Sequence, residues 1–235
     1  MVDLFVDIET VPDLTAEEYL EAKQQIDSGD LTKDSDRGRF WKFKIGSLTP
    51  FDGRIILITY RINDAHIFRL KEWEDGEKGM LEKFYNTVME LQRGKGDKLR
   101  IIGHNILGFD MAFLYNRMVF HKIAEDKWIH HWLLRKPLIL DLLQMHMPLN
   151  SYRSKGLKHD VLAYAYGLPT KDTSGGDEAQ HYFAKDYEKV LQYSEREFIY
   201  PEMFARMESD GMVSEEKLQE SIKHYNTLHE NDTRY

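Results

Sequence analysis

The chain has 235 residues, of which 42% are hydrophobic, and it carries a formal net charge of −8 and no cysteine. This length is sufficient for one well-buried domain, and the lack of cysteine excludes disulfides and thiolate metal sites. Because no apolar run approaches the roughly 20 residues of a membrane span and the N-terminus lacks the pattern of a signal peptide, we expect a soluble, cytoplasmic protein without a membrane partner. The negative charge disfavours binding of duplex nucleic acid over the whole surface, but it is compatible with a local nucleic-acid groove.

Apolar runs bounded by polar residues predict strands, and apolar residues at spacings of three and four predict helices. In chain order the predicted elements are a strand over 3–8, a helix over 17–26, strands over 54–61 and 65–70 joined by a hairpin at 63–64, a helix over 77–91, a strand over 99–103, a helix over 111–121, a strand over 137–142, a helix over 157–166 and a long helix over about 183–207. Residues 27–38 and 170–177 are predicted as exposed loops, and Thr15 and Ser214 as helix N-caps. This order predicts an α/β fold, a mixed β-sheet with helices on both faces.

The first strand carries two acidic residues, Asp7 and Glu9, in an otherwise apolar run. Residues i and i+2 of a strand point to the same face, so the two carboxylates are expected side by side. Carboxylates held that close repel one another unless a cation lies between them, and oxygen ligands suit Mg²⁺ or Mn²⁺. The alternative interpretation is that both residues end an edge strand and face water.

Two further segments carry acids in a suggestive context. Asp110 follows a strand and a turn at the start of a helix, where the exposed amides favour a carboxylate, so it is either a site residue or only a cap. Tyr193 and Glu197 are i and i+4 in the long predicted helix, so they share a face. The alternative for this pair is an ordinary solvated helix surface.

In their order and context these segments resemble the DEDD exonuclease superfamily, in the branch related to the proofreading domain of family-B DNA polymerases. Residues 5–10 resemble the first motif of that family, residues 103–110 the second and residues 193–197 the third. The resemblance implies a ribonuclease-H-like fold and a freestanding, metal-dependent 3′-5′ exonuclease that acts on single-stranded DNA ends, alone or with a repair or replication protein. We expect residues 1–210 to form this domain and residues 211–235 to form its C-terminal helical extension.

The resemblance also implies a role for each matched residue. Two divalent cations, Mg²⁺ or Mn²⁺, would flank the scissile phosphate, and Tyr193 would orient the attacking water. The expected metal ligands are Asp7, Glu9, Asp110 and Glu197. The residues expected to hold the terminal nucleotide are Thr10, Asn105 and Phe109.

One position departs from the family, which normally has aspartate where this chain has Glu197. A longer acid moves the fourth carboxylate, so a catalytically weakened domain that binds nucleic-acid ends or a partner is an alternative function. RNA-trimming and structure-selective endonuclease activities are further alternatives. Asp186 is a rival fourth acid, paired with either Tyr182 or His181. We prefer Glu197, because the third motif of the family usually lies in a helix that continues beyond it.

Two other features invite a function. Residues 39–44 interleave basic and aromatic side chains in the loop predicted after the first helix, which suits either a platform for a single nucleic-acid strand or aromatic packing against the core. Asp141, at the end of the strand over 137–142, either supports the acidic site or caps the strand end. The histidines are scattered and predict no zinc site.

Overall fold

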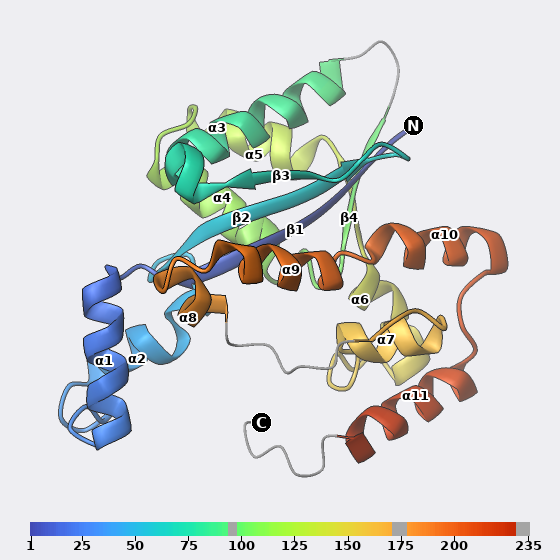
Figure 1. Ribbon diagram of the computed structural model, residues 1–235. Coiled ribbons are helices and arrows are strands. Elements are labelled where there is room, and N and C mark those ends of the chain that lie inside the picture. Colours follow the sequence, from blue (N-terminus) through green and yellow to red (C-terminus); the bar gives the residue numbers. More distant parts are fainter. Residues whose placement is uncertain (94–97, 171–177, 229–235) are drawn as a thin grey trace.

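The computed structural model describes residues 1–93, 98–170 and 178–228, apart from the side chain of Glu197. The loop predicted over 170–177 therefore lies outside the described residues from residue 171 onward. Within the described part, five strands form one sheet in the order β3-β2-β1-β4-β5 (Figure 1). β2 is antiparallel to both β1 and β3, whereas β4 is parallel to β1 and β5 is parallel to β4. The strands are β1 (Val2–Pro12), β2 (Gly53–Ile62), β3 (Phe68–Lys71), β4 (Leu99–Gly103) and β5 (Leu138–Asp141).

Helices fill most of the remaining described chain. The α-helices are α1 (Ala16–Ser28), α2 (Arg37–Ile45), α3 (Glu72–Arg93), α4 (Asp110–Phe120), α5 (Asp126–His130), α6 (Leu142–His146), α7 (His159–Ala165), α8 (Glu178–Phe183), α9 (Tyr187–Glu197), α10 (Tyr200–Asp210) and α11 (Glu215–Leu228). Three short helices of other types are η1 (Gly46–Leu48), η2 (His131–Arg135) and η3 (Met147–Asn150). Among the described residues, none of the helices combines the length and the apolar character needed to cross a membrane.

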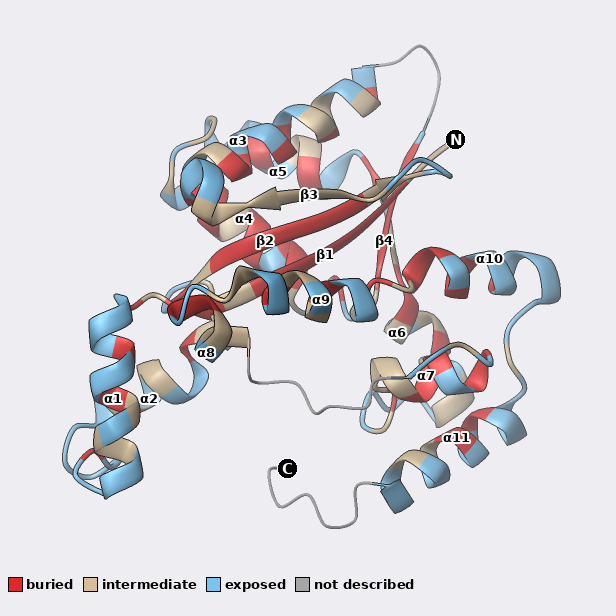
Figure 2. Ribbon diagram, viewed as in Figure 1, coloured by how far each residue is buried: buried red, intermediate tan, exposed pale blue. Residues whose placement is uncertain are grey.

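The two faces of β1 pack against different parts of the chain. Leu4, Val6 and Ile8 belong to a core shared with α3 and α4. Phe5 and Val11 point to the opposite face, where they belong to two separate hydrophobic clusters. Figure 2 shows the central strands as buried. In Figure 1, α3 to α5 lie over one face of the sheet and α7, α9 and α10 over the other. The predicted α/β fold, a mixed β-sheet with helices on both faces, is confirmed.

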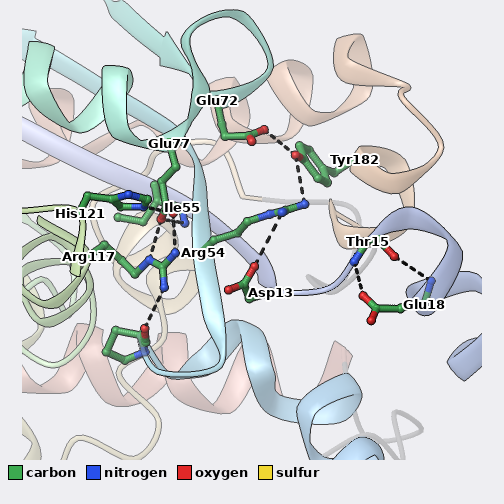
Figure 3. A network of polar contacts seen from close by, with 11 residues as sticks. Asp13, Thr15, Glu18, Arg54, Ile55, Glu72, Glu77, Arg117, His121 and Tyr182 are labelled. Atoms are coloured by element: carbon green, nitrogen blue, oxygen red, sulfur yellow. Dashed lines mark hydrogen bonds and ion pairs between the residues drawn. The ribbon is translucent and has the colours of Figure 1, made fainter.

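Both predicted helix caps are present. The Thr15 hydroxyl accepts a hydrogen bond from the Glu18 amide, and the Glu18 carboxylate accepts one from the Thr15 amide (Figure 3). At α11, the Lys217 amide donates to the Ser214 hydroxyl at 3.2 Å. Each cap satisfies amides that a helix start leaves without an intrahelical acceptor, which explains why these two starts could be predicted.

The prediction of one long helix over 183–207 is wrong, because α8 ends at residue 183 and two separate helices, α9 and α10, follow it. α9 ends at Glu197, and Pro201 lies in the first turn of α10. Proline has no amide hydrogen, and its ring clashes with the carbonyl four residues earlier, so α9 cannot continue through it. Lys185, with φ 60°, separates α8 from α9. The preference for Glu197 can therefore no longer rest on a continuing helix.

A second correction concerns α2, which lies where the sequence predicts a loop. The Asp36 side chain caps this helix by accepting a hydrogen bond from the Arg39 amide at 3.0 Å. The Phe43 ring stacks on Tyr19 of α1 at a centroid distance of 5.0 Å. No residue of α2 is buried, so the helix lacks the core-facing apolar stripe on which helix prediction depends.

Candidate active site

Asp7 and Glu9 lie on one face of β1, between its two hydrophobic clusters. Phe5 belongs to the cluster on one side of them and Val11 to the cluster on the other side. The acids are 8% and 7% exposed, so they do not face open water as the edge-strand interpretation requires. The β1–β2 register shifts directly after Glu9, and such a bulge changes the direction of the following side chains.

Asp110 reaches the same strand from the start of α4. Its Oδ1 accepts a hydrogen bond from the amide of Ile8, the residue between the two acids of β1, at 3.1 Å. Burial, together with the negative charges of Asp7 and Asp141, raises the pKa of Asp110 well above its usual range. A proton or a cation is therefore favoured at this carboxyl. Asp110 is more than a helix cap, because its side chain joins α4 to β1.

The position of α9 follows from a row of side chains across three strands. Thr59 of β2 is directly opposite Asp7, and Arg69 of β3 is directly opposite Thr59. The Thr59 and Ser194 hydroxyls are 2.8 Å apart in a buried hydrogen bond, and Arg69 lies 3.9 Å from the Glu195 carboxylate. These two contacts place α9 across the sheet at the level of Asp7.

Tyr193 precedes Ser194 on α9 and lies near the acids. Burial raises the pKa of Tyr193, as do the negative charges of Glu178, Glu9 and Asp7. The phenol therefore stays protonated at neutral pH and acts as a hydrogen-bond donor, not as a base. The side chain of Glu197, one helical turn further along, lies outside the described part of the structure.

The rival third motif lies elsewhere. The Tyr182 hydroxyl donates to Glu72 at the start of α3 and lies 3.4 Å from Arg54 (Figure 3). Asp186 is at the N-cap position of α9, where its carboxylate pairs with Lys189 at 3.0 Å and with His181 at 3.8 Å. Of the two tyrosines, it is therefore Tyr193 that lies near the acids of β1.

One residue beside the acids was missed by sequence reasoning. The hydroxyl of Tyr200, the first residue of α10, donates a hydrogen bond to Asp7 Oδ1 at 2.9 Å. Burial and the charges of Asp7 and Asp110 raise the pKa of Tyr200, so it remains a donor. Its ring meets His159 edge to face at 5.3 Å. The only sequence signal was Pro201, because a proline after an aromatic residue indicates a helix start at that point.

The loop between β4 and α4 is held by Asp141. Its carboxylate accepts hydrogen bonds from the amides of Asn105 at 2.9 Å and Leu107 at 3.1 Å, and also from Leu143 at the start of α6. Asp141 therefore caps α6 at the end of β5 and holds the loop that precedes Asp110, while its support of the acidic site stays a prediction. Asn105 adopts φ 54°, an uncommon conformation that this support stabilises.

The remaining predicted substrate residues surround the acids from two sides. Phe109 is half-buried and packs on Phe113 with ring centroids 4.9 Å apart. The Thr10 hydroxyl donates to the Ser47 carbonyl of η1 at 2.6 Å. Asn105 is exposed at the turn before Phe109. Among the described residues, no group of three or more histidine or acidic side chains is arranged so that it could hold a metal ion.

Comparisons with known proteins place this geometry in context. The model of a family described as predicted 3′-5′ exonucleases related to the exonuclease domain of PolB matches residues 54–234. The match includes Asp110, Tyr193 and Glu197, and it begins after β1. A search of curated proteins gives no match. Among solved structures, Escherichia coli exonuclease I in complex with a dA16 oligonucleotide is similar, at 14% identity and a TM-score of 0.40; the alignment covers 85% of this chain and 42% of that chain.

Proposed function

Because the chain belongs to the family of predicted 3′-5′ exonucleases related to the exonuclease domain of PolB, we propose that it hydrolyses phosphodiester bonds from the 3′ end of single-stranded DNA. The observation that carries this proposal is the convergence of Asp7, Glu9 and Asp110, three buried carboxylates of which two are adjacent on one strand face and the third bonds to the amide between them. Tyr193 adds a protonated phenol from a helix that crosses at the same level.

Hard divalent cations prefer oxygen ligands, and these carboxylates supply them. Their side chains would have to move closer together around an ion, because no such group is preformed among the described residues. Burying three carboxylates together is unfavourable without positive charge, and burial, together with the negative charge of Asp7, raises the pKa of Asp110. We propose that Asp7, Glu9, Asp110 and Glu197 hold Mg²⁺ or Mn²⁺. When bound, two such ions would supply an activated water and stabilise the leaving 3′ oxygen.

The other residues would position the reacting groups. The Tyr193 hydroxyl, which is hydrogen-bonded to Glu178 in this structure, would donate to the attacking water when substrate is bound. The Tyr200 hydroxyl keeps the Asp7 carboxylate in a fixed orientation. The loop held by Asp141 presents Asn105 to the terminal nucleotide, while Phe109 offers a ring on which the terminal base stacks. Thr10, fixed by its bond to η1, directly follows Glu9 and would contact the terminal nucleotide from there.

The direct test is digestion of 5′-labelled single-stranded DNA and RNA in Mg²⁺, in Mn²⁺ and in excess chelator, with a circular single-stranded DNA in parallel. We expect a ladder that shortens from the 3′ end, faster on DNA, lost with chelator, and no cleavage of the circle. Faster shortening of RNA would favour the RNA-trimming function, and cleavage of the circle an endonuclease. No shortening with either metal would leave the weakened, end-binding domain as the better explanation.

The assignment of the fourth acid has its own prediction. Glu197→Ala should lower turnover by at least about 100-fold, since each metal-ligating carboxylate supports several kcal/mol of charge stabilisation. The matched variant Asp186→Ala should retain activity within about threefold, because Asp186 pairs with Lys189 instead of lying near Asp7. Single-turnover rates on a 5′-labelled oligonucleotide measure both. The reverse pattern would move the third motif to Asp186.

Tyr200→Phe tests the hydrogen bond to Asp7, because it removes only the hydroxyl that donates it. Removing the hydroxyl leaves the ring packing on His159 intact, so we expect the free energy of unfolding to change by no more than about 1–3 kcal/mol. Losing a hydrogen bond that orients a metal ligand typically costs about 10–100-fold in metal affinity or activity. The affinity for Mn²⁺, measured by titration calorimetry, and the turnover rate should decline together. Tyr166→Phe, which removes a buried hydroxyl bonded to His146, is the control, and equal effects of the two variants would contradict the role of Tyr200.

A further inference from the structure

The segment from α2 to the start of β2 exposes apolar side chains in an ordered pattern. Trp41 and Ile45 share one face of α2 at positions i and i+4, and Leu48 lies beyond the end of this helix, in η1. The three side chains are 41%, 43% and 64% exposed. Phe51, in the turn that follows η1, is 80% exposed. With Lys44 these residues form what we call the aromatic-basic surface. Figure 2 shows α2 without any buried residue.

Several contacts fix this surface in place. The Ser47 carbonyl accepts the hydrogen bond from Thr10, and the Pro50 carbonyl lies 3.5 Å from the Arg117 guanidinium. A Cβ added at Gly53 would lie 2.5 Å from the Gly46 carbonyl oxygen, so this turn has room only for glycine. Exposure of the aromatic side chains is therefore a built feature of an anchored turn. Large apolar side chains gathered at the surface are typical of interaction sites.

The charge of the segment indicates the kind of partner. Residues 37–51 contain four cations and no acid, in a chain whose net charge is −8. Arg39 pairs with Glu21 at 2.9 Å, whereas Lys44 is exposed on the same stripe as Trp41. Phosphates complement such a segment. Aromatic side chains interleaved with cations are the usual means by which proteins bind single strands, since bases stack on the rings and the backbone follows the charges.

The surface adjoins the acidic site. Thr10 directly follows Glu9 in β1, and its hydroxyl is bonded to Ser47, the residue before Leu48. Figure 1 places α2 beyond the C-terminal end of β1, which is the end that follows Glu9. The acidic site and the surface are therefore joined through Thr10 and Ser47.

We propose that the aromatic-basic surface binds the single-stranded DNA segment that leads to the 3′ end, with bases stacked on Trp41 and Phe51 and a phosphate at Lys44. This inference rests on the proposed function and specifies the path of its substrate. Because the surface lies outside the acidic site, it should increase affinity for long strands and leave the hydrolysis of very short ones unchanged.

The first test measures binding without hydrolysis. Fluorescence anisotropy in excess chelator would compare DNA strands of 4, 8 and 16 nucleotides on the full chain. Trp41→Ala and Phe51→Ala should each weaken binding of the 16-mer by about 5-fold to 100-fold, the range of one lost base stack. Lys44→Gln should reduce the salt dependence of log Kd by about 0.7, the value for one phosphate contact on a single strand. Trp128→Ala, at a side chain 46% exposed on α5, is the matched control and should bind as the wild type.

The second test separates this inference from the proposed function. Wild type, Trp41→Ala and Phe51→Ala should cleave a labelled trinucleotide equally, while both variants raise KM on the 16-mer. If the wild type degrades DNA but the variants bind the 16-mer normally, only the proposed role of the aromatic-basic surface is contradicted. If the wild type degrades nothing but binding still depends on Trp41 and Phe51, only the exonuclease proposal is wrong. Loss of a wild-type dimer in these variants, seen by sedimentation with DNA binding unchanged, would identify a protein interface and overturn the inference.

Discussion

Asp110→Asn is expected to lower hydrolysis by at least about 100-fold and yet to leave the metal-free protein at least as stable as the wild type. Asparagine keeps the oxygen that accepts from the Ile8 amide. It removes a buried negative charge that Asp7 and Asp141 repel, as the raised pKa of Asp110 indicates. In chelator the variant should therefore unfold at the wild-type temperature or above it, and a gain of about 1 kcal/mol corresponds to about 2–4 °C.

The same substitution should remove most of the stabilisation that the cation gives. A ligand that binds only the folded state raises its stability in proportion to the logarithm of ligand concentration over Kd. The wild-type melting temperature should rise on addition of Mn²⁺, and that of the variant should rise much less. Asp34→Asn, in an exposed loop, is the control and should behave as the wild type in both conditions. A variant that unfolds well below the wild type in chelator, or that responds equally to Mn²⁺, would contradict a metal role for Asp110.

The acids of β1 could be placed from sequence because their geometry is local. Alternation along a strand puts Asp7 and Glu9 on one face whatever the rest of the chain does. The apolar residues around them predict burial of that strand, which the structure confirms. Asp110 could also be predicted from sequence, because a strand, a turn and a helix start form a recognisable unit. These positions needed no knowledge of how distant segments meet.

Residues placed by tertiary contacts could not be predicted in the same way. Tyr200 reaches Asp7 only because Pro201 ends the preceding helix and turns the chain, and the sequence pattern of three-and-four spacing continues across this break. The choice between Tyr193 and Tyr182 depends on which tyrosine lies near β1, and it is the bond between Ser194 and Thr59 that holds α9 across the sheet. The role of Tyr193 stays a prediction. A pairing across 135 positions leaves no local signal.

A buried ion network behind the sheet leads to the second large prediction. Glu77 of α3 is 7% exposed on its side chain and accepts hydrogen bonds from Arg117 Nε at 2.8 Å and from the Ile55 amide at 2.9 Å. Its Oε2 also lies 2.7 Å from His121 Nε2 (Figure 3). Ile55 is the partner of Thr10 across the bulge. The network thus joins α3 and α4 to the part of β2 that borders the site.

Arg117→Met should lower the free energy of unfolding at pH 7 by about 3–5 kcal/mol, because it leaves the Glu77 carboxylate buried without its main partner. Adding Glu77→Met should recover a large part of this loss, since two apolar side chains leave no buried charge. Arg61→Met is the control, because its partners Asp64 and Glu202 are exposed and such pairs contribute about 0–1 kcal/mol. Urea unfolding followed by circular dichroism measures all three.

The pH dependence of this loss follows from the charge state of Glu77. Burial raises the pKa of Glu77, but hydrogen bonds from Arg117, His121 and the Ile55 amide outweigh it and hold the pKa below its ordinary value of 4.5. In the wild type this carboxylate therefore stabilises the fold above about pH 4.5, and the contribution is lost as the pH falls through the lowered pKa. In Arg117→Met, burial prevails and the acid is best accommodated when protonated. The difference between wild type and variant should consequently shrink from pH 7 to pH 4, and a difference that is equal at both pH values would mean that Arg117 acts through packing alone.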